Sequence, residues 1–406
     1  MNIFFLLAIT LVLIVYMLRK HIPLGLCMLT GGLLIWAVRS LEPAALGQAG
    51  AEMLSLPRTY DIIFALYFVM CLEIELRVSG VLSGMVGALK RIFSSVRVLL
   101  AVMPAFLGLL PSLGGARFSA PMVGELAKGL DLSADHQSAI NYRFRHLFEY
   151  SSPLIPGMIM ACSIADVPFS AFLKHLSWLT PVAFAAGWFV LIRPIHVVRQ
   201  DVPQETREEK RHEDMDLLLA LSSVVVTFLM VVLFDFSASV ALGLITFLLF
   251  FVLMAMRRFV SAKDIWGGAL DGKMLVNVIG ILYFIQLLSV TNVLTEIVTA
   301  FQAAPLPVPV IIACVSFIIG QLTGMSQGHV AIVMPIVAAM GTGNLNLAGV
   351  AMVFGVAGQM LTPTHLCLVV TMDYFKAGFF GTLKPIFLTE LMILTIFSVY
   401  TYFTWA

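Results

Sequence analysis

Charged side chains are scarce in this sequence. Lys, Arg, Asp and Glu together make up only 12% of the 406 residues, whereas 60% are hydrophobic and the mean hydropathy is +1.00. Water-soluble domains carry about 25% charged residues, so this composition excludes a soluble globular protein. Apolar stretches of membrane-spanning length recur from end to end, which predicts an all-α polytopic membrane protein.

Cysteine is also scarce, and none of the five residues has the paired spacing of a disulfide framework or a zinc site. All of them lie within apolar runs, where cysteine usually acts as a small packing residue. They are Cys27, Cys71, Cys162, Cys314 and Cys367. We therefore expect neither a disulfide nor a metal centre. A cleaved leader is not expected either, because Met1-Asn2 supplies no positive charge before the first apolar run.

Ten transmembrane spans are predicted, together with two regions whose apolar runs are each too short to cross the membrane. The spans cover residues 2–18, 22–38, 60–76, 140–165, 176–195, 216–234, 237–256, 273–289, 345–371 and 383–403. The regions 98–130 and 308–341 each contain two apolar runs that are separated by a glycine-containing turn. A crossing needs about 20 residues, so we predict re-entrant helical hairpins. Short tilted spans joined by tight turns are the alternative.

The two halves of the chain repeat each other. The tripeptide Leu-Tyr-Phe at 66–68 recurs at 282–284, and the order of spans, hairpin and broken span is the same in both halves. We predict one repeat over 1–198 and a second over 216–406, joined by a charged cytoplasmic linker at 199–215. Each half crosses the membrane an odd number of times, so the second repeat is inverted, as in many secondary transporters.

The distribution of basic residues predicts the orientation. If the N-terminus lies outside, most of the 24 Lys and Arg residues fall on the inner side. The positive-inside rule therefore predicts a cytoplasmic (inner) membrane protein with both termini outside. The first hairpin then enters from the cytoplasm and the second from outside.

The tip of the first hairpin is a candidate anion site. Its candidate residues are Ser112, Gly114, Gly115, Arg117 and Ser119. Glycines let the backbone approach a ligand, and the half-helix that follows directs N–H groups into the tip. A guanidinium at membrane depth costs about 3 kcal/mol or more and normally faces a cavity or a partner. Arg117 is thus expected to bind a carboxylate, to pair with Glu149 or Glu125, or to snorkel to the cytoplasmic face.

The tip of the second hairpin offers donors and acceptors beside two glycines. Its candidate residues are Gly324, Ser326, Gln327, Gly328 and His329. His329 can titrate near neutral pH, so it is interpreted either as a proton carrier or as a hydrogen-bonded structural histidine.

Two predicted spans carry proline in their interiors, which indicates broken helices. Proline removes a helix hydrogen bond and frees a carbonyl group. The candidates are Ser151, Ser152 and Pro153 in the first half and Thr362, Pro363, Thr364 and His365 in the second. Hydroxyl groups and carbonyls suit a hard cation, so we predict Na⁺ bound through Ser152, Thr362 and hairpin-tip carbonyls. Simple proline kinks are the alternative.

Glu149 is a lone carboxylate beside the first break, and its counterpart in the second half is the neutral Gln359. Desolvation favours the protonated form of a carboxyl group, so Glu149 is a candidate proton carrier. A structural ion pair with Arg143 or Arg145 is the equal alternative.

The chain resembles the ion transporter superfamily, which includes divalent-anion/sodium symporters and citrate carriers. More narrowly, it resembles an uncharacterised integral-membrane family, domain of unknown function 401. The resemblance rests on Pro111–Pro121, Arg145–Tyr150, Pro153–Gly157 and Gly358–Leu368. It implies a homodimer with a scaffold domain and a transport domain that moves as an elevator. The dicarboxylate members carry Ser-Asn-Thr at both hairpin tips, which this chain lacks.

These patterns together predict a secondary active transporter that couples Na⁺ or H⁺ to the symport of a small organic anion. A cation/proton antiporter of the same superfamily is the alternative. No convergent nucleophile or metal cluster is visible in the sequence, so we do not expect an enzyme, and we expect no cofactor apart from the coupling ion. The expected partners are the anion, the cation and the lipid bilayer, without nucleic acid.

Overall fold

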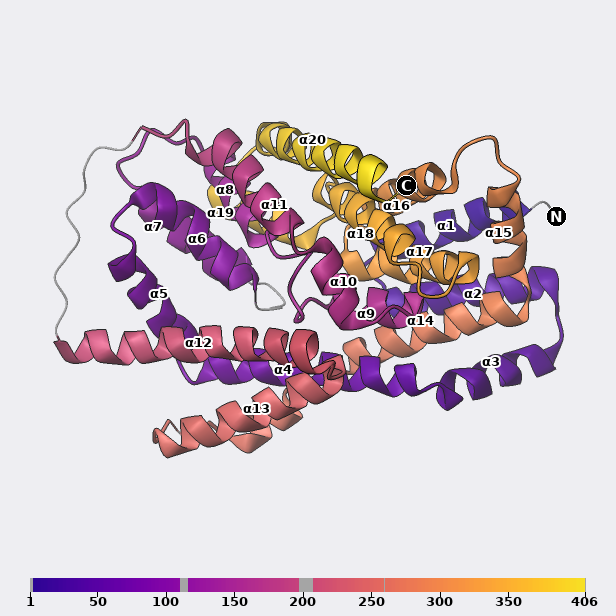
Figure 1. Ribbon diagram of the computed structural model, residues 1–406, viewed down its shortest axis with the longest axis horizontal. Coiled ribbons are helices and arrows are strands. Elements are labelled where there is room, and N and C mark those ends of the chain that lie inside the picture. The colour runs from indigo at the N-terminus through magenta and orange to yellow at the C-terminus, as the bar shows by residue number, and fades with distance from the viewer. Residues whose placement is uncertain (1–2, 110–115, 197–206, 259, 406) are drawn as a thin grey trace. The chain divides into compact units, whose positions relative to one another are not determined.

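Every regular element of the described chain is helical. The computed structural model describes residues 3–109, 116–196, 207–258 and 260–405. These residues form 20 α-helices and two π-helical segments, and no strand occurs among them (Figure 1). The all-α class predicted from the sequence is therefore correct.

The helices follow one another with short connections. The first half contains α1 (Ile3–Arg19), α2 (Leu24–Arg39), α3 (Pro43–Ser55), α4 (Pro57–Val78), α5 (Val81–Ile92), α6 (Val96–Gly108), α7 (Ala116–Leu126), α8 (Ala134–Arg145), α9 (Pro156–Ala165), α10 (Phe169–Leu176), α11 (Leu179–Gly187) and η1 (Trp188–Ile192). The second half contains α12 (Arg207–Phe234), α13 (Ala238–Ala255), η2 (Lys263–Gly267), α14 (Gly272–Val290), α15 (Val293–Gln302), α16 (Val308–Thr323), α17 (Ser326–Met340), α18 (Leu345–Met360), α19 (Leu366–Phe375) and α20 (Phe379–Thr404).

Five helical stretches of the described chain are long and apolar enough to cross a bilayer. They are Phe169–Ile192, His212–Phe234, Ala238–Ala255, Gly272–Val290 and Phe379–Thr404. Further apolar helices, including α1, α2, α16 and α18, have 10 to 17 residues. A helix rises 1.5 Å per residue, so the five long stretches match the hydrocarbon thickness. The chain is a multi-pass membrane protein.

The chain divides into two compact units, and each unit draws segments from both halves of the sequence. Unit 1 comprises Met1–Leu66, Ile159–Phe172 and Leu270–Thr364. Unit 2 comprises Tyr67–Met158, Leu173–Ala269 and His365–Ala406. Unit 1 holds the α16–α17 hairpin together with α18, whereas unit 2 holds α6, α7 and α8 together with α19 and α20. Long-range contacts thus decide the units, not the order of the chain.

Within unit 1, glycines allow helices to approach closely. Gly25 of α2 lies against the backbone of α14 at Val276, and its N–H donates to the Asn277 side chain at 2.9 Å. Gly320 of α16 faces the backbone carbonyl of Gly355 in α18, where a Cβ atom would overlap it. Small residues at such contacts let two membrane helices pack backbone to backbone. These contacts fix α16 and α18 as neighbours.

Within unit 2, α12 packs along α5 and begins earlier than the sequence suggested. Residues 207–215, predicted as part of a solvated linker, form the first turns of α12. Arg91 of α5 pairs with Glu213 at 2.7 Å and also with Asp214, and Arg258 pairs with Asp216. Desolvation opposes the charge of Arg91, but these carboxylates outweigh it and raise the pKa of the guanidinium. The ion pairs hold this charged segment in helical form.

Candidate functional site

The tip of the first hairpin lies mostly outside the described residues. Helix α6 ends at Gly108 and α7 begins at Ala116. The candidates Ser112, Gly114 and Gly115 fall in 110–115, and the side chain of Arg117 is also outside the described part. Ser119 is described and fully buried in α7. Glu125, one of the partners considered for Arg117, forms an ion pair with Lys128 at 2.5 Å.

The second hairpin turns within two residues. Gly324 ends α16 with φ +68°, a left-handed conformation that favours glycine, and α17 begins at Ser326 without a side-chain cap. Gly328 packs against the side chain of Thr323 on the opposite arm of the hairpin. Ser326 is buried and Gln327 is half-buried. The free N–H groups of an uncapped helix start point out of the first turn of α17.

His329 is fully buried, with 0% of its surface exposed. Its ring lies against Gly355 of α18, where a Cβ atom would overlap the imidazole. Neither ring nitrogen has a hydrogen-bond partner among the described residues, and the same holds for the buried hydroxyl of Ser316 in α16. A buried polar group without a partner costs free energy, so sites of this kind are typical places for a ligand, an ion or a water molecule.

The first predicted broken span is interrupted between Arg145 and Pro156, the residues that end α8 and begin α9. The interruption is buried. The Ser151 hydroxyl lies 2.7 Å from that of Thr180, and the Ser152 hydroxyl accepts the Leu154 N–H at 3.2 Å. Pro153 and Glu149 are also buried here.

The second break runs from Leu361 to His365, between α18 and α19. The hydroxyls of Thr362 and Thr364 lie 2.9 Å apart, and the Thr362 oxygen also accepts the Thr364 N–H at 3.3 Å. Thr362 is buried, whereas Pro363 and Thr364 are exposed. Two hydroxyls at this distance can share one cation or one proton.

Unit 2 contains a buried ion pair that sequence reasoning missed. Arg143 of α8 pairs with Glu390 of α20, and each side chain is only 1% exposed. The carboxylate partner of Arg143 is therefore Glu390, which is 247 residues away in the chain. This finding excludes the ion pair between Glu149 and Arg143, one of the two pairs that were considered for Glu149. Glu390 lies within the last predicted span, 383–403, where no motif distinguishes it.

Three further side chains meet in the same unit. The potential metal-ligand atoms of His146, His365 and Cys367 all lie within 4.8 Å of one another. The two histidine Nε2 atoms are 3.0 Å apart. Only His365 was a candidate from the sequence, because His146 is 219 residues away from it and the three residues do not form a known ligand spacing. Cys367, for which the sequence predicts a packing role, thus lies beside two histidines.

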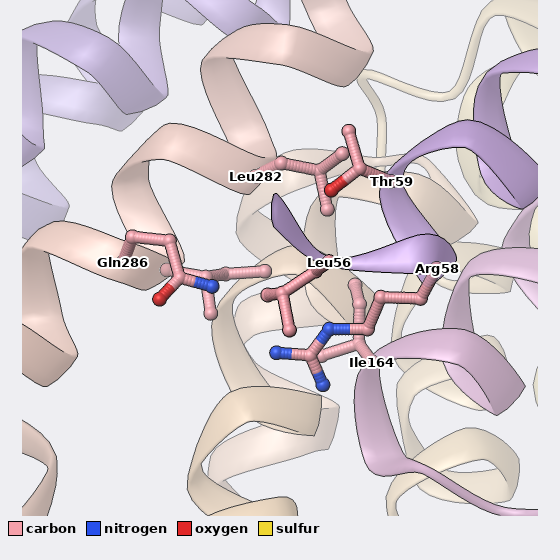
Figure 2. Close-up of a pocket in the computed structure, with 7 residues that line it drawn as sticks. Leu56, Arg58, Thr59, Ile164, Leu282 and Gln286 are labelled. Carbon is pink, nitrogen blue, oxygen red and sulfur yellow. The ribbon is translucent and has the colours of Figure 1, made fainter. Parts of the chain in front are cut away.

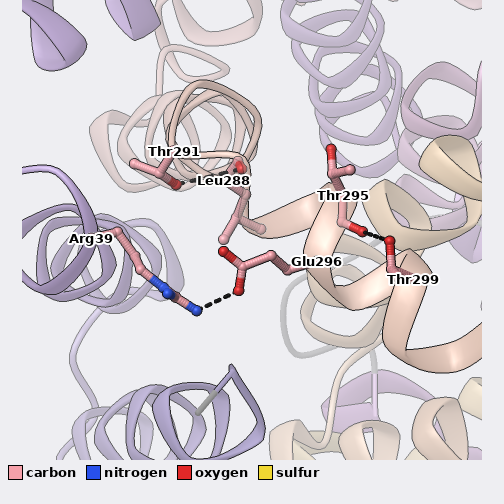
Figure 3. A network of polar contacts seen from close by, with 6 residues as sticks. All are labelled: Arg39, Leu288, Thr291, Thr295, Glu296 and Thr299. Atoms are coloured by element: carbon pink, nitrogen blue, oxygen red, sulfur yellow. Dashed lines mark hydrogen bonds and ion pairs between the residues drawn. The ribbon is translucent and has the colours of Figure 1, made fainter. Parts of the chain in front are cut away.

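Two other polar regions lie in unit 1 and contain none of the predicted site residues. A small pocket is lined mainly by aliphatic side chains, with Arg58 and Gln286 as its polar edge (Figure 2). Arg39 of α2 forms an ion pair with Glu296 of α15 at 2.5 Å (Figure 3). Both of these partners are partly exposed, so the pair ties α2 to α15 and does not enclose a ligand.

A family comparison covers nearly the whole chain. Residues 3–403 match the model of a family described as proteins of unknown function, DUF401. The chain belongs to this family. The narrower resemblance drawn from the sequence motifs is thereby confirmed, and the matched residues include both predicted hairpin regions and both helix breaks. No curated protein matches the chain.

Proposed function

We propose that this protein is a secondary active transporter, and not an enzyme, that couples Na⁺ or H⁺ to the symport of a small organic anion by alternating access. The proposal places two inverted repeats in the inner membrane, with both termini outside. It also includes a homodimer in which a transport domain moves as an elevator against a scaffold domain.

The single observation that carries the proposal is the recurrence of left-handed residues in the two halves. Ten of the eleven described residues with positive φ form five pairs: His21 with Asp235, Leu41 with Arg257, Gly80 with Asn292, Gly129 with Gly343, and Asp166 with Lys376. The offset runs only from 210 (Asp166 to Lys376) to 216 (Leu41 to Arg257). Residues other than glycine rarely adopt this conformation, so matched positions at a near-constant offset support a duplicated backbone.

The unmatched residue is also informative. Gly324 has φ +68° at the tip of the second hairpin. At offsets of 210 to 214, which four of the five pairs show, its counterpart falls at 110–114, outside the described residues. The two tips therefore occupy equivalent places in the two halves.

Equivalent hydrogen bonds support the same duplication. The Tyr67 hydroxyl donates to the carbonyl of Trp266 at 3.0 Å, and the Tyr283 hydroxyl donates to that of Leu46 at 2.9 Å. These tyrosines are the central residues of the repeated Leu-Tyr-Phe tripeptide. Likewise, Ser133 caps α8 and Asn344 caps α18. An odd number of crossings in each half makes the repeats inverted, and inverted repeats underlie alternating access.

The proposed anion site uses helix N-termini at the interruptions. Helices α7 and α17 start at hairpin tips, and α9 and α19 start after the breaks. The first N–H groups of a helix lack internal partners and carry a partial positive charge, so they favour an anion. The unpartnered His329 beside the second tip adds a donor or a proton carrier. Arg117 at the first tip is the proposed guanidinium ligand for a carboxylate.

Reconstitution in proteoliposomes tests the proposal. A sodium or proton gradient should drive concentrative uptake of at least one labelled mono-, di- or tricarboxylate. Sodium-driven acidification or alkalinisation without an organic solute would instead support the cation/proton antiporter, in which Glu149 and the buried histidines carry the proton. Absence of both fluxes from folded protein would exclude both functions.

Arg117→Ala tests the ligand assignment. We expect uptake to fall at least about 10-fold, because a charge-assisted contact contributes about 1.5–3 kcal/mol. The matched control is Arg193→Ala, which removes an exposed arginine. Unchanged affinity for the anion in Arg117→Ala would remove this residue from the site but not the transport function.

A further inference from the structure

We propose that His146, His365 and Cys367 form a binding site for a thiophilic metal cation of the Zn²⁺, Cd²⁺ or Cu⁺ type. The three potential ligand atoms come from one compact unit and lie within 4.8 Å of one another. His146 directly follows α8, and the other two residues flank the start of α19. The inference is independent of the proposed transport function.

The hydrogen bonding of His146 orients its ring for metal ligation. Its Nδ1 lies 2.8 Å from the backbone carbonyl of Tyr142. A carbonyl oxygen can only accept, so Nδ1 carries the hydrogen, and Nε2 of the neutral ring presents a lone pair. A histidine that donates its second N–H to a backbone carbonyl is the usual arrangement of a metal ligand.

The second histidine already faces that lone pair. The Nε2 atom of His365 lies 3.0 Å from the Nε2 atom of His146. The hydrogen between the two rings belongs to His365, since His146 carries its own on Nδ1. When that hydrogen moves to Nδ1 of His365, each Nε2 atom presents a lone pair to a metal ion. Zn–N bonds of about 2.0–2.1 Å separate two tetrahedral ligands only slightly further than this, so small side-chain shifts suffice.

The ligand chemistry selects the class of metal. Two imidazole nitrogens and one thiolate sulfur suit borderline and soft cations, whereas Na⁺ and Mg²⁺ prefer oxygen ligands. Both histidines are buried, and Cys367 is partly exposed. The cysteine is thus the accessible member of the set.

The charges around the cluster admit a cation. The nearby Arg143 is neutralised by its ion pair with Glu390. Arg145 donates a hydrogen bond to the Cys367 sulfur, and Glu149 acts on the same sulfur with the opposite sign. The sulfur thus lies near charges of both signs and not beside an isolated positive charge.

Metal titration of the purified, tag-free, chelator-treated full-length protein in detergent tests the site. Cd²⁺ should give a thiolate-to-metal charge-transfer band with one equivalent bound, and Zn²⁺ should raise the unfolding temperature, because a ligand of the native state stabilises it. Cys367→Ser should abolish the band and weaken Cd²⁺ binding at least about 10-fold. Loss of a residue that only hydrogen-bonds to a metal ligand already weakens binding by about this factor, so loss of a ligand should weaken it at least as much. His365→Gln should weaken binding similarly.

Two matched variants serve as controls. Cys314→Ser removes an exposed cysteine and His196→Gln an exposed histidine, neither of them in the cluster. Both should bind Cd²⁺ like the unaltered protein. Equal binding by Cys367→Ser, or no band and no stabilisation in the unaltered protein, would overturn the metal site and leave the cluster as a pair of hydrogen-bonded histidines.

Discussion

At the scale of single residues, the Arg143–Glu390 pair shows how this protein can place two opposite charges away from water. Arg143 and Glu390 are each 1% exposed and are joined across α8 and α20. Removing two charges from water costs several kcal/mol, and the attraction between the two side chains offsets part of that cost. The pair therefore helps to specify which faces of α8 and α20 meet. Removal of one partner should lower the free energy of unfolding more than removal of both.

Arg143→Ala is expected to lower the free energy of unfolding by about 3–5 kcal/mol, because it leaves the Glu390 carboxylate buried without its cation. Thermal unfolding in detergent measures the effect. The double variant Arg143→Met/Glu390→Leu should lose less unfolding free energy than Arg143→Ala, because it leaves no unpaired charge in the buried site.

The matched control for this prediction is Asp373→Ala. Asp373 pairs with Lys376 at 3.0 Å, but both side chains are about four-fifths exposed. Exposed pairs contribute only about 0–1 kcal/mol. A loss in Arg143→Ala no larger than in Asp373→Ala would show that the buried pair does not hold α8 to α20.

At the scale of helices, glycine contacts and breaks decide how the elements meet. Gly320, Gly355 and Gly358 bring α16 and α18 so close that a Cβ atom at any of them would overlap backbone or a buried ring. The same contact places the ring of His329 over Gly355. The close packing of the second hairpin on α18 therefore also determines the surroundings of His329.

Gly355→Ala should destabilise the protein by about 1–3 kcal/mol, because the new methyl group overlaps the imidazole of His329, which is buried and has no room to move. The control is Gly47→Ala in α3, which meets no atom within 4 Å. That change should be neutral or stabilise by about 0.5–1 kcal/mol, because alanine favours the helix.

Thermal unfolding again provides the measurement, and a third variant identifies the cause. If the imidazole is the obstructing group, His329→Ala combined with Gly355→Ala should be less destabilised than the sum of the single variants. Strict additivity would mean that the methyl group disturbs the α16–α18 contact in another way.

At the scale of the whole molecule, the proposed inverted duplication makes a topological prediction. Lys128 and Thr342 precede the paired residues Gly129 and Gly343, and both are exposed. In a background without the native cysteines, Thr342→Cys should react with a membrane-impermeant maleimide in intact cells. Lys128→Cys should react only after the membrane is opened, because its repeat is the other way up. Labelling of both from the same side would contradict the inversion.

Much of the architecture followed from the sequence because the membrane restricts what a chain can do. Apolar runs of sufficient length become helices, and proline or glycine interrupts them, so the helical class and both helix breaks were predictable. The sequence was less informative about charge. The segment 207–215 was predicted as a linker, yet it is helical beside α5, because its carboxylates Glu213 and Asp214 meet Arg91.

The sequence by itself determined that this chain is a membrane protein and where its helices stop. What only the tertiary structure decided is which polar groups meet: Arg143 with Glu390, and His146 with His365 and Cys367. The physical reason is that hydrophobicity and backbone breaks act locally along the chain. Ion pairs and ligand clusters depend on residues that are hundreds of positions apart, and only packing brings them together.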